Sequence, residues 1–205
     1  GDDFDRILDE QLTRLQTDRL DFYLLHGLGR HHWEPVRRLG VLEFLDKVLR
    51  DGRVRHIGFI CHDDIKIFRE IVDSHDWEMC QVQYNYYDEH YQAGREGVRY
   101  AAARGIGVIA MEPLRGGKIV KRIPDDVRFA WESAPRKRSP VEWAFRWIWD
   151  QPELSMALSG MSSMKQLREN VDLAGDAEPG SLTQEDRDVI DRVRGIYRRM
   201  MKVDC

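Results

Sequence analysis

The feature that most constrains the fold of this chain is a regular alternation of short apolar runs with helical patterns. Each apolar run is short enough for a strand, and the segment after it carries apolar residues at helical spacing. Parallel strands need a crossover connection, usually a helix, so this alternation favours βαβ units and a parallel sheet. The expected strands are 20–26, 56–61, 79–84, 107–111 and 154–158.

Capping chemistry marks the expected starts of several helices. Ser139 stands before Pro140, and Glu142 follows at the third helical position, which is a strong helix start. Ser163, with Gln166 three residues later, repeats the pattern. The expected helices cover 4–15, 41–49, 65–72 and 98–104, or begin after 139, 163 and 183, and a loop rich in glycine and basic residues is expected after 111.

The strands read as continuous apolar runs, as expected when both faces of a parallel sheet are covered. Such a sheet is either doubly wound or closed into a barrel. Polar residues at the carboxyl ends of successive strands favour a (β/α)8 barrel, whose active sites are built at that rim. A dinucleotide fold would instead show Gly-x-Gly-x-x-Gly, and none occurs in the 205 residues. The rim candidates are His26, His62, Gln81, Asn85, Glu112 and Ser159.

Composition narrows the class of protein. The 32 basic and 36 acidic residues give a net charge of −4, so no field attracts nucleic acid, and no nucleic-acid partner is expected. No apolar run approaches the roughly 20 residues that cross a bilayer, so no membrane span is expected. Cys61 and Cys80 fit small buried hydrophobes of a reducing compartment, which makes the cytoplasm the expected location, and no CxxC spacing argues for a metal site.

Six segments, in order along the chain, resemble aldo-keto reductases: 12–26, 52–58, 81–85, 105–114, 159–163 and 166–170. This resemblance implies an α/β fold of the partial (β/α)8 TIM barrel type, with strands 4–8, their helices and a C-terminal helix. It treats 1–205 as one barrel-type domain that lacks the three N-terminal strands.

The family reduces aldehydes or ketones by hydride transfer from NADPH, while a tyrosine donates the proton. A lysine held by an aspartate lowers the pKa of that tyrosine, and a histidine orients the carbonyl. His26 matches the histidine. The other three belong to strands before Gly1, so the chain as given is expected to be inactive. The resemblance thus implies a cytoplasmic NADP(H)-dependent oxidoreductase with a small-molecule carbonyl substrate, NAD being the alternative cofactor.

The resemblance also implies a set of cofactor-binding residues. Gln81 matches the glutamine that bonds the nicotinamide carboxamide, Met111 lies against the ring, and the backbone of Leu114 approaches the pyrophosphate. The segment after the last strand matches the adenosine phosphate site, where hydroxyls and a helix N-terminus receive an anion. A plain helix cap is the alternative role for Ser163. Ser159 opens this segment and counts among the cofactor-binding residues. The candidates for the 2′-phosphate are Ser162, Ser163 and Lys165, and those for the adenine are Glu169 and Asn170.

Two other functions remain open at this point. Ile60 and Cys61 stand where the family has polar residues that contact the carboxamide, which favours a barrel that binds the nucleotide without turnover, as a sensor or assembly subunit. The other is a different TIM-barrel enzyme, such as a phosphate-sugar isomerase. Its only support is the loop at Gly116-Gly117, which suggests a phosphate loop but lacks the Walker spacing.

The end of the chain resembles a subgroup of the family that is associated with iron–sulfur clusters. In that subgroup a cysteine-rich module follows the barrel, so 181–205 is expected to be a C-terminal helix that leads toward such a module, with Cys205 as its first cysteine. One cysteine cannot hold a cluster, so a 4Fe-4S cluster is expected only in a longer chain.

Five strands of a barrel leave two sheet edges without a partner, an arrangement that folded proteins avoid. We therefore expect the isolated 205-residue chain not to fold as a stable monomer, unless a companion chain supplies the missing strands. Thermal unfolding of the purified chain, followed by circular dichroism, checks this. A sharp two-state transition from a monomer would contradict it.

Overall fold

The computed structural model describes residues 2–200. Their five strands form one sheet, and each strand pairs with the next one in the chain. A doubly wound sheet reverses its strand order at a switch point, whereas a barrel adds each strand beside the previous one. The order therefore confirms the partial barrel, and the sheet is not closed. The strands are β1 (Leu20–Leu28), β2 (Val54–Cys61), β3 (Met79–Gln83), β4 (Gly107–Met111) and β5 (Leu154–Ala157).

The helices follow the expected alternation. Each expected helix is present, and the caps at Ser139 and Ser163 accept the predicted backbone hydrogen bonds from Glu142 and Gln166. The helices are α1 (Asp2–Leu15), α2 (Trp33–Arg38), α3 (Val41–Arg50), α4 (Ile65–Val72), α5 (Gly94–Ala102), α6 (Asp125–Glu132), α7 (Pro140–Trp149), α8 (Met164–Gly175) and α9 (Gln184–Met200), with a short 3₁₀ turn, η1 (Arg115–Gly117).

Two helices and the 3₁₀ turn were not predicted. The expectation of a loop after 111 is wrong over α6, which begins after Pro124 with Asp125 and Asp126 in its first turn. Both features favour a helix start. The helix forms because its apolar side, which includes Val127 and Trp131, is buried. The six-residue α2 is too short to show a helical period.

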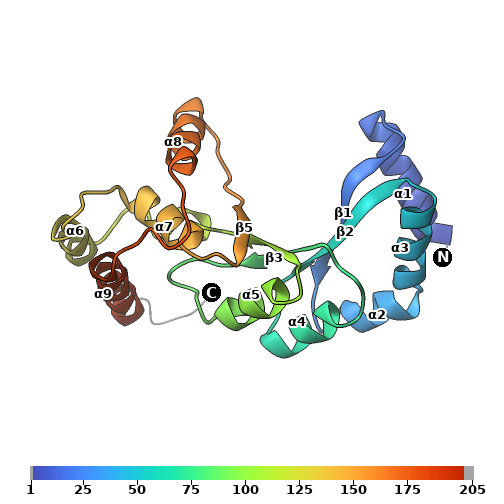
Figure 1. Cartoon of the computed structure of the whole chain (residues 1–205), viewed down its shortest axis with the longest axis horizontal. Helices are drawn as coiled ribbons and strands as arrows, with labels where there is room; N and C mark the ends of the chain where they lie inside the picture. The colour runs from blue at the N-terminus through green and yellow to red at the C-terminus, as the bar shows by residue number, and fades with distance from the viewer. Residues whose placement is uncertain (1, 201–205) are drawn as a thin grey trace. The chain divides into compact units, whose positions relative to one another are not determined.

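The described residues form two compact units, one of 2–82 and 92–108, the other of 83–91 and 109–200. In the first unit an aromatic cluster lies between the sheet and α4. The ring of Phe59 lies 5.7 Å from that of Phe68 and 5.1 Å from that of Trp77, all three buried. Helices α1 and α3 lie side by side in this unit (Figure 1).

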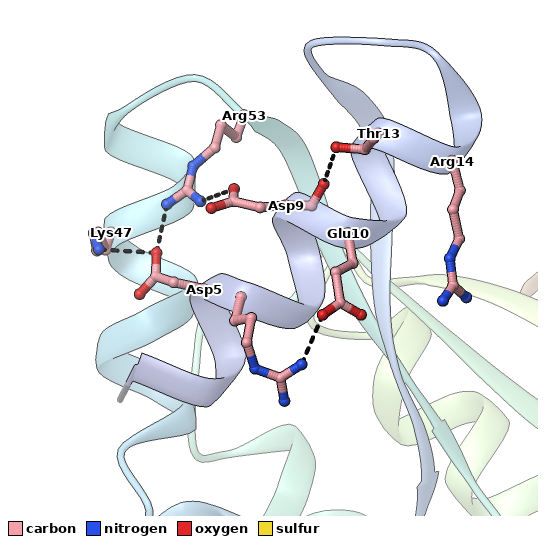
Figure 2. A pocket seen from close by; sticks show the side chains of 8 residues that line it. Asp5, Asp9, Glu10, Thr13, Arg14, Lys47 and Arg53 are labelled. Carbon is pink, nitrogen blue, oxygen red and sulfur yellow. Dashed lines mark hydrogen bonds and ion pairs between the residues drawn. The ribbon is translucent and has the colours of Figure 1, made fainter.

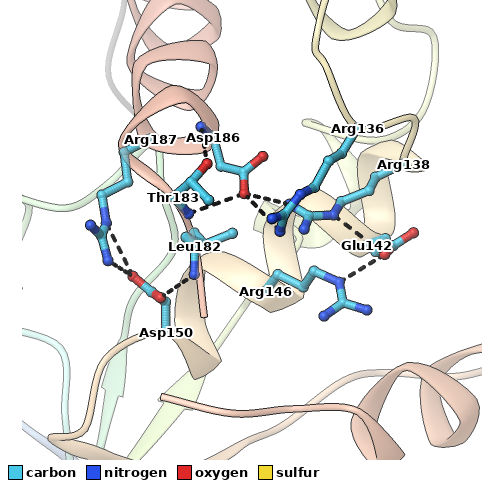
Figure 3. Close-up of polar contacts among 9 residues, drawn as sticks. All are labelled: Arg136, Arg138, Glu142, Arg146, Asp150, Leu182, Thr183, Asp186 and Arg187. Carbon is cyan, nitrogen blue, oxygen red and sulfur yellow. Dashed lines mark hydrogen bonds and ion pairs between the residues drawn. The ribbon is translucent and has the colours of Figure 1, made fainter. Parts of the chain in front are cut away.

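In the second unit, polar contacts join the start of α9 to Asp150, the C-cap residue of α7, and to the segment before α7 (Figure 3). The carboxylate of Asp186 is buried and accepts from the amide of Thr183 at 3.1 Å, while the Thr183 hydroxyl accepts from the amide of Asp186 at 3.2 Å. These two bonds form a capping box at the helix start that was expected after residue 183. Arg136 and Arg138 lie 3.4 Å from the same carboxylate, so the buried charge is paired.

The expectation that both faces of every strand are covered is wrong for the first and last strands. In β1 only Leu28 is buried, and Phe22 is 54% exposed; in β5 no residue is buried, and Met156 is 52% exposed. These are the two edge strands of an unclosed sheet, so part of their surface lacks a neighbour.

The cysteine expectation is confirmed for the two residues that can be placed. Cys61 and Cys80 are buried, and desolvation raises the pKa of each thiol to about 12. Both are neutral hydrophobic side chains at physiological pH. Cys205, the cysteine proposed to begin a further module, lies outside the described residues. Within 2–200, no helix is long and apolar enough to cross a bilayer.

A close approach between β2 and β3 generates a stability prediction. A Cβ atom at Gly58 would lie 2.6 Å from the backbone oxygen of Met79, its partner across the sheet. Since backbone atoms cannot move aside cheaply, we expect Gly58→Ala to destabilise the complete protein by about 2 kcal/mol, as for other overpacked sites.

Urea unfolding measures the effect, with Gly175→Ala as the matched control. A Cβ at Gly175 would meet no atom within 4 Å, and the residue lies in α8, where alanine is the better helix former. Equal midpoints for Gly58→Ala and the unmodified protein would show that the strands can separate without cost.

Candidate functional site

A cavity of about 580 Å³ lies in the second unit, between the segment that follows β4 and the segment that follows β5. Both walls thus begin at carboxyl ends of parallel-type strands, where barrels of this architecture place their ligands. The first wall is built from Glu112, Pro113, Leu114, Gly116, Gly117, Val120 and Lys121, and Val141 of α7 adds to the lining. The second wall is built from Leu158, Ser159, Gly160, Met161, Ser163, Lys165, Gln166, Glu169 and Asn170.

The first wall is a tight turn with an unusual backbone. Glu112 and Arg115 have φ values of 51° and 49°, and Gly116 and Gly117 follow with 62° and 87°. The amide of Gly117 donates to the carbonyl of Leu114 at 2.8 Å, which closes η1. Left-handed backbone of this kind is routine for glycine and rare for other residues. This left-handed backbone forms the tight turn that makes up the first wall.

The second wall is the entry into α8. Ser163 is the N-cap residue, and its hydroxyl accepts from the amide of Gln166 at 3.3 Å. The side-chain oxygen of Gln166 accepts from the amide of Ser162, the residue before the N-cap, at 2.9 Å, so the helix entry is held from both sides. Asn170 donates to the hydroxyl of Ser159 at 3.1 Å, so the strand end is tied to the helix. The helix N-terminus and the side chain of Lys165 make this wall attractive to an anion.

The cavity collects six of the nine residues predicted to bind a cofactor. Ser162 does not line it but is bonded to Gln166, which does. Met111 ends β4 in the same unit and is half-buried, while Gln81 lies in β3, in the first unit. The six that line the cavity are Leu114, Ser159, Ser163, Lys165, Glu169 and Asn170.

Sequence reasoning missed several residues of the first wall. Among them, Lys121 brings a second lysine to the cavity. Glu112, which was one of the rim candidates, adds a carboxylate. The dense run of glycine and basic residues from 115 to 122 was the available signal. This run lacks the Walker spacing of a phosphate loop, yet Gly116 and Gly117 both line the cavity.

His26 lies in the first unit, inside β1 rather than at its end. The strand continues to Leu28 because the register with β2 shifts between Leu25 and Leu28, and Gly27 takes a φ of 68° within this bulge. Bulges redirect side chains and are common beside active sites. The His26 side chain is exposed. The carbonyl of Gly27 lies 3.2 Å from Nδ1 of His32.

An ion pair joins the loop after β1 to the loop after β2. The guanidinium of Arg30 lies 2.5 Å from Asp63 and 2.7 Å from Asp64, and the Arg30 amide donates to Asp63 at 2.7 Å. These hydrogen bonds hold the pKa of the Asp63 carboxyl well below its usual range. Asp63 therefore acts as a structural link between the two loops. Cys61, two residues before it, is buried.

A second depression, of about 860 Å³, lies on the outer helices of the first unit, between α1 and α3 (Figure 2). Arg53 contacts Asp5 at 2.8 Å and Asp9 at 3.0 Å, and Lys47 contacts Asp5 at 2.8 Å. None of the predicted site residues lines it. Its charged groups join helix to helix, so we assign the candidate site to the cavity of the second unit.

An α/β chain whose strands pair in sequence order, with a polar cavity after β4 and β5, defines a (β/α) barrel-type protein with a candidate ligand site at strand ends. The family comparison makes this specific. The model of the Aldo/keto reductase family matches residues 2–194, and the chain belongs to this family of oxidoreductases.

Curated relatives are more distant. L-galactose dehydrogenase of Arabidopsis thaliana is 25% identical over 192 residues, which cover 87% of this chain and 60% of that protein. Glyoxal reductase of Bacillus subtilis is 26% identical over 186 residues, which cover 89% of this chain and 60% of that protein. The chain thus spans about 60% of the length of these relatives.

Solved structures show the same fold. The aldo-keto reductase AKR11C1 from Bacillus halodurans, in its holo form, matches with a TM-score of 0.74 and 24% identity, covering 92% of this chain and 63% of that one. An aldo/keto reductase from Klebsiella pneumoniae, in complex with NADP and acetate, matches with a TM-score of 0.72 and 22% identity, covering 93% of this chain and 64% of that one.

Proposed function

We propose that the complete protein is a cytoplasmic NADP(H)-dependent oxidoreductase that reduces a small aldehyde or ketone. In this proposal the chain contributes the nucleotide side of the site together with His26. One observation carries it: the cavity of the second unit gathers six residues that the sequence singled out for a dinucleotide. The complexes of two family structures from Klebsiella pneumoniae with NADP and NADPH support the choice of cofactor.

The residues of the cavity fit a phosphorylated nucleotide. Lys121 on one wall and Lys165 on the other bring positive charge, and the N-terminus of α8 adds its dipole. The carboxylates of Glu112 and Glu169 can accept hydrogen bonds from ribose hydroxyls or an adenine amine. The volume of about 580 Å³ falls in the range of about 300–1,000 Å³ found for small-molecule sites.

A bound nicotinamide supplies the hydride. Our proposal gives the chain's own residues the work of orientation. The imidazole of His26 donates a hydrogen bond to the carbonyl oxygen of the substrate, and Gln81 bonds the carboxamide. Met111 covers one face of the ring with its thioether. The proton donor and its lysine and aspartate partners have no match in these 205 residues, so this chain by itself is proposed to be inactive.

Two further parts of the proposal come from the sequence. NAD is the alternative cofactor, and the Lys165 experiment below tests this choice. A 4Fe-4S cluster belongs to the proposal only for a longer chain that supplies cysteines beyond Cys205.

A second candidate function is nucleotide binding without turnover. The half-buried Ile60 and the buried Cys61 favour it, because neither side chain can bond the carboxamide as the family's polar residues do. Titration of the complete protein with NADPH, followed by its fluorescence, separates the two functions. Binding without oxidation of NADPH by any aldehyde or ketone would favour the sensor.

The activity prediction concerns His26. We expect the complete protein to oxidise NADPH in the presence of aldehydes, and His26→Ala to lower kcat/KM by about 100-fold, the lower end of the range for lost proton-transfer and polarising groups. Absorbance at the NADPH band measures the rate. His31→Ala, an exposed histidine of the following loop, is the matched control and should leave the rate unchanged. Equal rates for His26→Ala and wild type would remove His26 from the mechanism.

The cofactor prediction concerns Lys165. If its charge faces the 2′-phosphate, we expect Lys165→Ala to raise the Kd for NADPH about tenfold. The loss of a hydrogen bond to a charged group costs about 1.5–3 kcal/mol, and a tenfold change lies at the lower end of that range. The Kd for NADH, which has no 2′-phosphate, should stay nearly unchanged. Lys121→Ala is the comparison variant on the opposite wall. It should weaken both nucleotides alike. A loss for Lys165→Ala that is equal for NADPH and NADH would argue against a role in 2′-phosphate recognition.

A further inference from the structure

We propose that Arg115 is a positioning residue that fixes the first wall of the cavity from behind, through a buried ion pair with Asp88. The inference rests on the proposed function in one respect, namely that the ligand of the cavity is a nicotinamide nucleotide. Neither Arg115 nor Asp88 lines the cavity, whereas Leu114 and Gly116, the neighbours of Arg115, both do.

The ion pair is buried on both sides. The side chains of Arg115 and Asp88 are each 6% exposed, and Nε of the arginine lies 3.0 Å from the carboxylate. The guanidinium carbon also lies 4.1 Å from the ring centre of Tyr87, in cation–π geometry. Such a pair contributes little net stability, but the loss of one partner leaves a buried charge uncompensated. The geometry around it is therefore strongly specified.

The backbone supplies an independent observation. Arg115 holds a φ of 49°, and the next two positions, with φ values of 62° and 87°, are glycine. Glycine is the residue that this conformation favours, and a side chain there strains the backbone. An arginine nevertheless occupies the first of three consecutive left-handed positions. The arginine side chain makes contacts that a glycine at this position could not make. These are the buried ion pair with Asp88 and the cation–π contact with Tyr87.

The segment after β3 grips the same loop at a second point. Asn85 is fully buried, and its side-chain amide donates to the carbonyl of Glu112 at 3.1 Å. Its oxygen accepts from the amides of Tyr87 and Asp88, at 3.1 Å and 2.9 Å, which orders the turn that carries the carboxylate. The loop is thus held at Glu112 and at Arg115. The cavity wall lies between and beside these two anchors.

The decisive variant is Arg115→Gly in the complete protein. Glycine satisfies the backbone conformation and removes only the side chain, so a purely conformational requirement predicts unchanged binding. We expect the Kd for NADPH, from fluorescence titration, to rise about tenfold, because small displacements of a binding wall cost one to two orders of magnitude. Asp88→Asn, which keeps the shape and removes the charge, should give a smaller rise. A Kd for Arg115→Gly equal to that of wild type overturns the proposal.

Arg194→Met is the matched control. Arg194 lies in α9 and holds the segment after β3 that also carries Asp88. It pairs with Glu89 at 2.6 Å and donates to the carbonyl of Tyr86, and its side chain is only 13% exposed. Its loss should lower the unfolding temperature while the Kd for NADPH stays within about twofold of wild type, because its partners Tyr86, Glu89 and Asp191 lie outside the loop of the first wall. A rise equal to that of Arg115→Gly would mean that both residues merely stabilise the fold, and would overturn positioning.

A structural readout that does not depend on NADPH completes the test. Amide hydrogen exchange over 112–118 should accelerate in Arg115→Gly and not in Arg194→Met, with both variants folded by circular dichroism. Wild-type protein that fails to bind NADPH would overturn the proposed function. Equal exchange over 112–118 in wild type and Arg115→Gly would overturn the positioning role alone.

Discussion

The crossover requirement of a parallel sheet governs this structure. After each strand the chain must cross back to the starting edge of the sheet before the next parallel strand can begin. Every strand is therefore followed by a loop and then a helix. The loops at the carboxyl ends of the strands can therefore differ in sequence. In this chain, polar side chains link neighbouring loops. Arg30 and Asp63 do so in the first unit, and Asn85 and Glu112 in the second. In the second unit, the link at Glu112 joins the wall of the candidate cavity.

The polar links differ in how deeply they are buried, and this difference matches their roles. The pair of Arg30 and Asp63 is partly exposed, so solvent screens it and it adds little to stability. Asn85, Asp88 and Arg115 are buried, where an unpaired polar group is costly and a specific geometry is enforced. The more buried network stands behind the cavity wall, which is where a fixed position matters most.

Much of the fold could be predicted from local patterns. The apolar runs gave the strands to within a few residues, and the hydroxyl of Ser163 caps α8 as its spacing with Gln166 indicated. What could not be predicted depends on contacts distant in the sequence. The bulge that extends β1 beyond His26 depends on register with β2, and α6 depends on burial of its apolar side. The pairing of Asp88 with Arg115 spans 27 residues and has no local signature.

The distribution of candidate residues between the two units bears on function. The cavity is built wholly from the second unit, which has its own core of stacked Trp131 and Trp143 and its own buried carboxylate at Asp186. His26 belongs to the first unit. In the proposed function, the cavity for the phosphate and adenine side of the nucleotide and the histidine that orients the carbonyl therefore belong to different units. Loss of the residues proposed for turnover would leave the residues of the cavity unchanged. Binding without turnover is therefore a coherent alternative for a protein of this family.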